Sequence, residues 1–253
     1  MMNQESSHSM HGHESHVHSE PAIRIDDIQT NWVISPAEIS PNQETEISLS
    51  IKSDGKILTS FSAVHEKQMH MLVISHDLSI FQHLHPNYDG EGKFSVKTTF
   101  PKAGKYKIFA DFLPEGSAQQ LAKYDVIVEG EEQNETVNPD KELKKAVDDL
   151  VFELKFDDLA VKKHILMTFT VTDRKGHKIK ELEPYLGSAG HVVIVSEKMD
   201  EFLHVHPKDE ATKGPDVEYM TTFPSSGKYK IWGQFKYLGK LYTVPFIINV
   251  PSK

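Results

Sequence analysis

Short runs of alternating apolar and polar residues recur along most of the chain. Segments such as TEISLSI (45–51), MHMLVI (69–74), KFSVKTTF (93–100) and KYKIFADF (105–112) are rich in β-branched and aromatic side chains. Proline, glycine, asparagine and aspartate separate the runs, which is typical of the strands and turns of a β-sandwich. The pattern therefore predicts an all-β protein.

The strand pattern occurs twice. HMLVISHDLSIFQHLHP at 70–86 recurs as HVVIVSEKMDEFLHVHP at 191–207, and FPKAGKYKIFADF at 100–112 recurs as FPSSGKYKIWGQF at 223–235. Each copy has roughly the ~100 residues that a sandwich of this kind uses. We therefore expect two tandem domains, each an immunoglobulin-like or cupredoxin-like β-sandwich.

Changes in composition suggest the boundaries. We expect a disordered tail rich in His and Met at residues 1–21, sandwiches at 22–129 and 149–253, and an acidic linker at 130–148. Apolar residues recur at helical spacing between Pro139 and Leu150, which predicts a helical turn at the end of the linker.

Composition excludes several functional classes. The formal net charge of -9 offers no basic surface for a nucleic-acid backbone or an anionic membrane. No stretch approaches the ~18 consecutive apolar residues of a membrane helix. The chain has no cysteine, which excludes disulfides, Cys-ligated zinc, iron–sulfur clusters and thiol nucleophiles. Any bound metal must be held by His, Met or carboxylate side chains.

The N-terminal tail is rich in histidine. Five of the 15 histidines lie there beside Met10, namely His8, His11, His13, His16 and His18. Imidazole and thioether together suit copper in both oxidation states, and imidazole alone also suits zinc and nickel. We interpret the tail as a natural metal-collecting segment, with a cloning remnant as the alternative.

A second group of histidines lies in the repeated hairpin. If His76–Ser79 form the loop, Leu72 pairs with His83 and His70 pairs with His85. Side chains alternate along a strand, so the three imidazoles share one face, with opposed Cβ atoms ~4.5–5.5 Å apart. Three imidazoles at that spacing can converge on one ion at the ~2.0–2.1 Å typical of metal–nitrogen bonds. A register slip of one residue would move His70 to the other face.

The second copy predicts the same arrangement, with His191 opposite His206 and His204 beside them. A lone histidine on an apolar strand is usually structural, but a cluster of three costs hydrogen-bond partners and invites charge repulsion. We therefore favour metal ligation, and a hydrogen-bonded structural cluster stays open as the alternative. Alternation turns Met69 and Met71 to the opposite face, where core packing is favoured over thioether ligation.

Two further ligands are available in the first copy only. His65 precedes the hairpin and Asp111 lies in the later FADF segment, from which both can reach the same end of the sandwich. The aligned residues of the second copy are Leu186 and Gln234. The two sites are therefore not expected to be equivalent.

Common enzyme motifs are missing from the sequence. There is no Gly-rich phosphate loop, no G-x-S-x-G elbow and no H-E-x-x-H helix. Three-histidine zinc with an open position is itself a catalytic arrangement, so a metal-dependent hydrolase or copper oxidase stays open. We favour a binding protein over an enzyme, because the sequence marks out no general base or substrate pocket.

The histidine hairpins also carry a family resemblance. The strings VHEKQMHMLVISHDLSIFQHLHP and LEPYLGSAGHVVIVSEKMDEFLHVHP, with the trailing GKYKIWGQF, resemble a family of bacterial extracytoplasmic β-sandwich proteins, often secreted or lipoproteins. The resemblance covers most of residues 55–250 and implies an envelope location and copper handling. It points to His65, His70, His83, His85, His191, His204 and His206 as metal positions. An exported protein begins with a signal peptide or a lipobox cysteine, so we expect that a leader has been removed from this chain.

These observations predict an extracytoplasmic protein that binds metal for buffering, delivery or resistance. Copper is the expected metal and zinc is the alternative. The metal ion is the expected partner, no nucleic acid or membrane span is expected, and no protein partner can be named. The alternatives are a metal-dependent enzyme with an open histidine site, and an adhesion or scaffold module whose histidines are structural.

Overall fold

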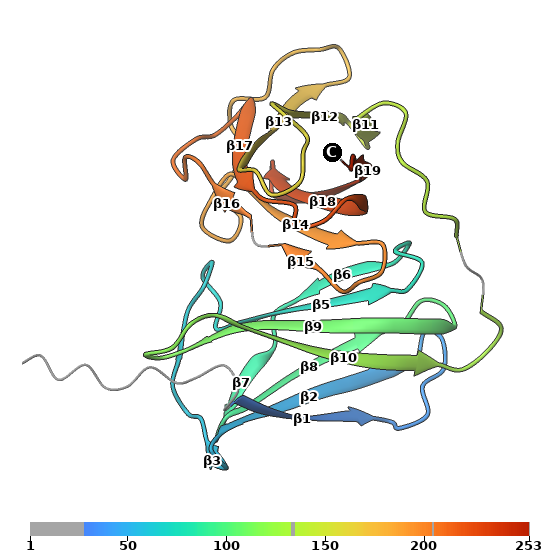
Figure 1. Cartoon of the computed structure of the whole chain (residues 1–253), viewed down its shortest axis with the longest axis vertical. Helices are drawn as coiled ribbons and strands as arrows, with labels where there is room; N and C mark the ends of the chain where they lie inside the picture. Colours follow the sequence, from blue (N-terminus) through green and yellow to red (C-terminus); the bar gives the residue numbers. More distant parts are fainter. Residues whose placement is uncertain (1–27, 133–134, 204, 253) are drawn as a thin grey trace, which may run out of the picture.

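The computed structural model describes residues 28–132, 135–203 and 205–252. In that part of the chain every regular element is a strand, and the strands form two β-sandwiches stacked one on the other (Figure 1). None of the described segments is a helix of the length and apolarity needed to cross a bilayer. The predicted fold class, all-β with two tandem sandwich domains, is confirmed.

The first sandwich consists of two antiparallel sheets. One sheet contains β1 (Ile28–Ser35), β2 (Glu44–Ser53), β8 (Lys93–Thr99) and β7 (Asn87–Gly90) in that order, with β3 (Lys56–Ile57) paired to β2. The other contains β10 (Gln120–Val128), β9 (Gly104–Pro114), β5 (Met69–Ser75) and β6 (Phe81–Leu84), with β4 (Phe61–Ser62) paired to β9. The histidine hairpin is β5–β6, and the chain then crosses to the first sheet as β7.

The second sandwich repeats this plan. One sheet has the order β11 (Lys144–Val147), β12 (Leu150–Phe156), β13 (Ile165–Asp173), β17 (Asp216–Thr221) and β16 (His206–Pro207). The other has the order β15 (Phe202–Leu203), β14 (Gly190–Ser196), β18 (Gly227–Tyr237) and β19 (Lys240–Val250). The second histidine hairpin is β14–β15, and the chain again crosses to the other sheet directly after it.

Strand β5 is buried on both faces. Met69 and Met71 pack in the core of the first sandwich, as predicted from the alternation. Leu72 and Ile74 point the other way, into a separate apolar cluster. The face that carries His70 is therefore an outer face of the first sandwich and not its interior.

That outer face packs against the matching face of the second sandwich. The buried members of the joint cluster occupy equivalent positions of the two sequence copies: Leu72 with Val193, Ile74 with Val195, Leu78 with Met199, and Phe109 with Trp232, while the linker adds Val137. In Figure 1 the β5–β6 and β14–β15 hairpins lie at this junction. The repeat therefore supplies both halves of one apolar interface.

Two aromatic stacks across this interface are reciprocal. Phe81 stacks on Trp232 with ring centroids 4.6 Å apart, and Phe202 stacks on Phe109 at 5.6 Å. Because Phe81 aligns with Phe202 and Phe109 with Trp232, each stack repeats the other with the two domains exchanged. This is the contact pattern of a two-fold interface, formed here within one chain.

The segment before Leu150 differs from the expected helical turn. Lys144–Val147 form β11, which pairs with β12, and Asp148–Asp149 make a two-residue hairpin turn in which Asp148 has a φ of 51°. The helical prediction is wrong, because pairing with an open sheet edge outweighs weak apolar spacing over so short a segment. Strand β11 lies within the span expected to be linker and belongs to a sheet of the second sandwich.

Candidate metal centre

The register of the first hairpin is the predicted one. Leu72 pairs with His83 and Ile74 pairs with Phe81 along β5–β6. The hairpin loop is held by Asp77, whose Oδ1 accepts hydrogen bonds from Ser75 Oγ at 2.6 Å and from the Ser79 backbone N–H at 3.1 Å. This closed loop fixes the register on which the histidine geometry depends.

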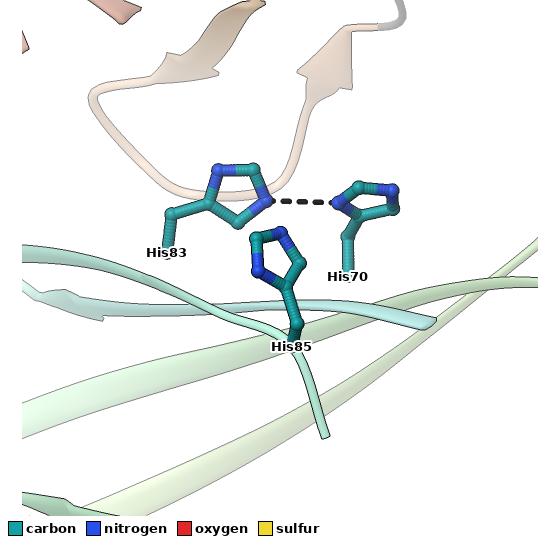
Figure 2. Close-up of side chains that lie close together, drawn as sticks. All are labelled: His70, His83 and His85. Carbon is teal, nitrogen blue, oxygen red and sulfur yellow. Dashed lines mark hydrogen bonds between the residues drawn. The ribbon is translucent and has the colours of Figure 1, made fainter. Parts of the chain in front are cut away.

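Three histidines converge on this hairpin, as predicted. One ring nitrogen from each of His70, His83 and His85 lies within 4.8 Å of the others, and Figure 2 shows the three rings turned toward a common point. Their ring centroids are 5.2 Å apart for His70 and His83, 5.1 Å for His70 and His85, and 4.8 Å for His83 and His85. We call these residues the histidine triplet.

Two members of the triplet have one ring nitrogen committed to an outside acceptor. His70 Nε2–H donates to the carbonyl oxygen of Val64 at 2.8 Å. His83 Nδ1–H donates to Oε1 of Gln234, in the second domain, at 2.7 Å. A neutral imidazole has one N–H and one lone pair, so the inner nitrogens of both rings carry lone pairs. These inner atoms, His70 Nδ1 and His83 Nε2, are only 3.0 Å apart (dashed in Figure 2).

Protonation is disfavoured as a way to relieve this contact between lone pairs. Burial, together with the neighbouring histidines, lowers the pKa of His70 to about 4 and that of His83 to about 3, although their outer hydrogen bonds act in the opposite direction. Both rings are therefore neutral at pH 7. Two neutral nitrogens with facing lone pairs are the arrangement of metal ligands, in which a cation lies where a proton would otherwise be needed.

The third member also offers a nitrogen without a partner. His85 Nε2 is buried and finds no hydrogen-bond partner among the described residues. Burial and the positive charge of Lys67 lower the pKa of His85 as well. A buried polar atom without a partner is costly, so an ion bound at the triplet would remove that penalty.

The additional first-domain candidates lie beside the triplet. His65 occupies a tight turn in which Val64 and Lys67 exchange backbone hydrogen bonds, and its ring centroid is 6.1 Å from that of His70. Asp111 pairs with His70 across the β5–β9 ladder, and its two carboxylate oxygens accept hydrogen bonds from Gln119 at 2.7 and 2.8 Å. Neither residue belongs to the compact group of ligand atoms.

The second hairpin has the predicted register, but its ladder ends before the predicted pair of His191 and His206. Its ladder pairs Val195 with Phe202 and Ile194 with Leu203, and then ends. His206 instead begins β16, which pairs with β17 in the other sheet, and His204 lies outside the described residues. The tail positions His8, His11, His13, His16 and His18 also lie outside them.

His191 lies against the first domain. Its ring centroid is 5.0 Å from that of His83 and 5.7 Å from that of His70, on which it stacks with an interplanar angle of 10°. Its cross-strand partner is Gln234, the residue that holds His83. This contribution of the second domain was not predicted from the sequence. The signal in the sequence was the alignment of Gln234 with Asp111, since both residues pair with the first histidine of their hairpin.

An interdomain cavity of about 210 Å³ adjoins the site. Its polar lining is His65, His70, His83, Asp111, Gln119 and His191, and apolar side chains of β14 and β15 form much of the remaining wall. On the other side His83 and His85 line a more open groove together with Lys67 and Tyr185. His83 therefore lines both the cavity and the groove.

Comparison with known proteins identifies a family. The family model described as "Domain of unknown function (DUF8832)" matches the chain twice, at residues 21–130 and 145–252. No curated protein matches the chain.

Similar solved structures include two bacterial adhesins and a fibronectin-like module. The Escherichia coli adhesin FdeC is 16% identical over 92% of this chain and 66% of its own, with a TM-score of 0.30. The Yersinia pseudotuberculosis adhesin InvE is 10% identical over 87% and 59%, with a TM-score of 0.26. The fibronectin(III)-like modules of Clostridium thermocellum CbhA are 13% identical over 87% and 92%, with a TM-score of 0.24. The chain thus spans less than two thirds of either adhesin, and nothing about function follows from these values.

Proposed function

We propose that this chain, which belongs to the DUF8832 family, is an extracytoplasmic protein that holds one transition-metal ion at His70, His83 and His85. The observation that carries the proposal is the 3.0 Å contact between His70 Nδ1 and His83 Nε2, two atoms that both bear lone pairs. In a tetrahedral site with ~2.0–2.1 Å metal–nitrogen bonds, neighbouring ligand nitrogens lie ~3.3 Å apart. The two atoms therefore need to move by only a few tenths of an ångström.

The outer hydrogen bonds support the same proposal. Metal-bound histidines almost always donate their other N–H to a carbonyl or carboxylate, which fixes the tautomer and the ring orientation. The Val64 carbonyl does this for His70, and the Gln234 amide oxygen does it for His83. Copper is the first candidate because imidazole sites bind it most tightly among the divalent metals, and zinc is the second.

Three protein ligands leave a coordination position open. Such a position permits exchange of the ion with a partner, as buffering, delivery or resistance requires, and the groove at His85 gives access to the site. The same open position is used in catalytic zinc sites, so a metal-dependent enzyme is the second candidate. Turnover that requires metal and disappears in His85→Ala would favour the enzyme.

An adhesion or scaffold module is the candidate without a metal. Tandem sandwiches joined through a buried interface suit a rigid scaffold, and the triplet would then be a structural cluster. In that case removing the triplet would lower stability by ~1–3 kcal/mol for each lost buried contact and leave metal content unchanged.

The deciding experiment is a titration with copper and with zinc against a competing chelator. The protein carries serine in place of the five tail histidines, so that the tail contributes no imidazole. We expect one tight equivalent, which is lost in the triple variant His70→Ala, His83→Ala, His85→Ala and retained in His164→Ala, an exposed histidine of the second domain. Unchanged stoichiometry in the triple variant would contradict the proposal.

A further inference from the structure

The second domain brings one pair of side chains to the triplet. His191 on β14 and Gln234 on β18 are cross-strand partners. Gln234 already accepts a hydrogen bond from His83. The His191 ring lies 5.0 Å from His83 and 5.7 Å from His70, close to the 4.8–5.2 Å spacing within the triplet itself. A fourth imidazole therefore stands at the edge of the proposed site, on the other domain.

The interface holds His191 in this place. His70 and His191 are equivalent residues of the repeat and stack on each other. They therefore lie at the approximate two-fold axis that relates the two domains. Lys230 Nζ donates to the carbonyl oxygen of Leu78 at 2.6 Å, and Lys123 Nζ donates to that of Asp200 at 2.7 Å. These bonds across the domain boundary, together with the aromatic stacks, fix how β14 lies on β5.

His191 is available for coordination. No hydrogen bond to its ring nitrogens is present within the part of the chain that the structure describes. Its nitrogens lie outside the compact group of the triplet, and the adjoining cavity of about 210 Å³ gives the side chain room to rotate toward it.

We propose that His191 takes the coordination position that the triplet leaves open, so that the ion ties the two domains together until an exchange partner displaces this ligand. This inference rests on the proposed function. Coupling of this kind is reciprocal: docking of the second domain tightens metal binding, and bound metal stabilises docking by the same factor. The repeat then provides one metal site built from both copies in place of one site in each.

Trp232 provides a reporter for the test. It is one of two tryptophans and stacks on Phe81 at the interface, so in a Trp32→Phe background its fluorescence follows docking. Urea unfolding of the full chain, with the tail histidines replaced by serine, is followed with and without zinc, a metal that has no redox chemistry. Zinc affinity is measured in parallel by chelator competition.

We expect zinc to raise the urea midpoint of the Trp232 transition. In His191→Ala one equivalent still binds, the affinity falls by at least the ~10–100-fold that loss of an outer-shell partner costs, and the zinc-dependent shift of the midpoint becomes smaller. His191→Gln, which keeps the size of the side chain, should behave alike, and the exposed His164→Ala should behave as the parent does.

Two outcomes would overturn the inference, and they differ. Unchanged zinc affinity and an unchanged midpoint shift in both His191 variants would remove His191 from the site and leave the triplet as proposed. Absence of zinc and copper binding by the parent protein would remove the proposed function itself.

Discussion

The two histidine hairpins have the same motif and the same register, but in the first the three histidines lie together, whereas in the second the backbone of His206 pairs with the other sheet as part of β16. Both are preceded by the same tight turn, with Val64 and His65 in the first copy and Tyr185 and Leu186 in the second. His65 and Leu186 both have positive φ, at 47° and 55°. The backbone has therefore been retained while the side chain that could bind metal has not.

The difference extends to the carbonyl that the turn presents. In the first copy the Val64 carbonyl binds the Nε2–H of His70 and thereby selects its tautomer. The equivalent bond from His191 to Tyr185 is not formed among the described residues, and His191 lies against the other domain. We therefore expect the acceptors that orient the histidines, and not the ligand residues alone, to decide which copy binds an ion.

The largest expected effect comes from removing the same histidine from each of the two sequence copies in turn. His85→Ala and His206→Ala remove equivalent histidines of the repeat. We expect His85→Ala to abolish the tight metal equivalent and His206→Ala to retain it, because β16 carries the backbone of His206 to the other sheet. Equal loss in the two variants, measured by metal analysis after chelator competition, would mean that each domain has its own site.

The reciprocal aromatic stacks allow a second test of the comparison. Trp232→Ala and Phe109→Ala each remove one ring from an interface stack, and each should cost about 3–5 kcal/mol in the free energy of unfolding. Trp232→Ala should weaken zinc binding more than Phe109→Ala does, because Trp232 also lies two residues from Gln234 on the same face of β18, whereas Phe109→Ala acts through docking alone. Urea unfolding and zinc titration separate the two effects, and equal zinc affinities would break the distinction.

Acid should weaken the metal-free protein through the triplet. The pKa values of His70 and His83 are about 4 and about 3 in the folded state, against 6.5 for the ordinary side chain. The unfolded chain therefore takes up protons first, and the free energy of unfolding falls as the pH decreases below about 6.5. Each histidine contributes a slope of at most ~1.4 kcal/mol per pH unit.

Urea unfolding between pH 7 and pH 5, in the presence of a chelator, measures this slope. The double variant His70→Gln, His83→Gln should show a shallower dependence on pH than the parent, and His164→Ala should show the same dependence. A slope that is unaffected by the double variant would mean that other groups dominate the response.

The smallest expected effect concerns the aligned pair Gln234 and Asp111. Gln234→Leu removes the acceptor of His83 and should weaken metal binding by ~10–100-fold without changing stoichiometry. Gln234→Glu retains an acceptor and should retain the affinity. Asp111→Asn should weaken binding less than Gln234→Leu does, and the reverse order would show that Asp111 is the more important residue.

Much of the first hairpin could be predicted from sequence, because period-two alternation has few solutions. It places Met69 and Met71 on one face and His70, His83 and His85 on the other once the loop is located. The loop was found because His76–Ser79 interrupts two apolar runs. Alternation could not tell which face is interior, since every residue of β5 is buried.

The parts of the site that lie between the domains could not be predicted from the sequence. In the sequence, Gln234 has the pattern of an ordinary strand residue, and its contact with His83 forms only when the domains dock. His191 was assigned to its own hairpin because the local strand register was the only information available. The strand β11 was missed for a related reason, since its partner is supplied by the tertiary structure and not by its own short apolar pattern. Local rules find ligands on one hairpin and fail at contacts between domains.

The linker makes the reciprocal interface an intramolecular contact. Two separate chains that met through such an apolar face would associate only to the extent that their concentration allowed. Here the backbone N–H of Glu135 donates to Asp77 and Lys228 donates to the carbonyl of Val137, so the connecting segment is attached to both halves. Tethering of this kind typically provides effective concentrations in the mM range. Dilution therefore cannot separate the halves, and a site shared between them would survive at the low protein levels at which a dimer would fall apart.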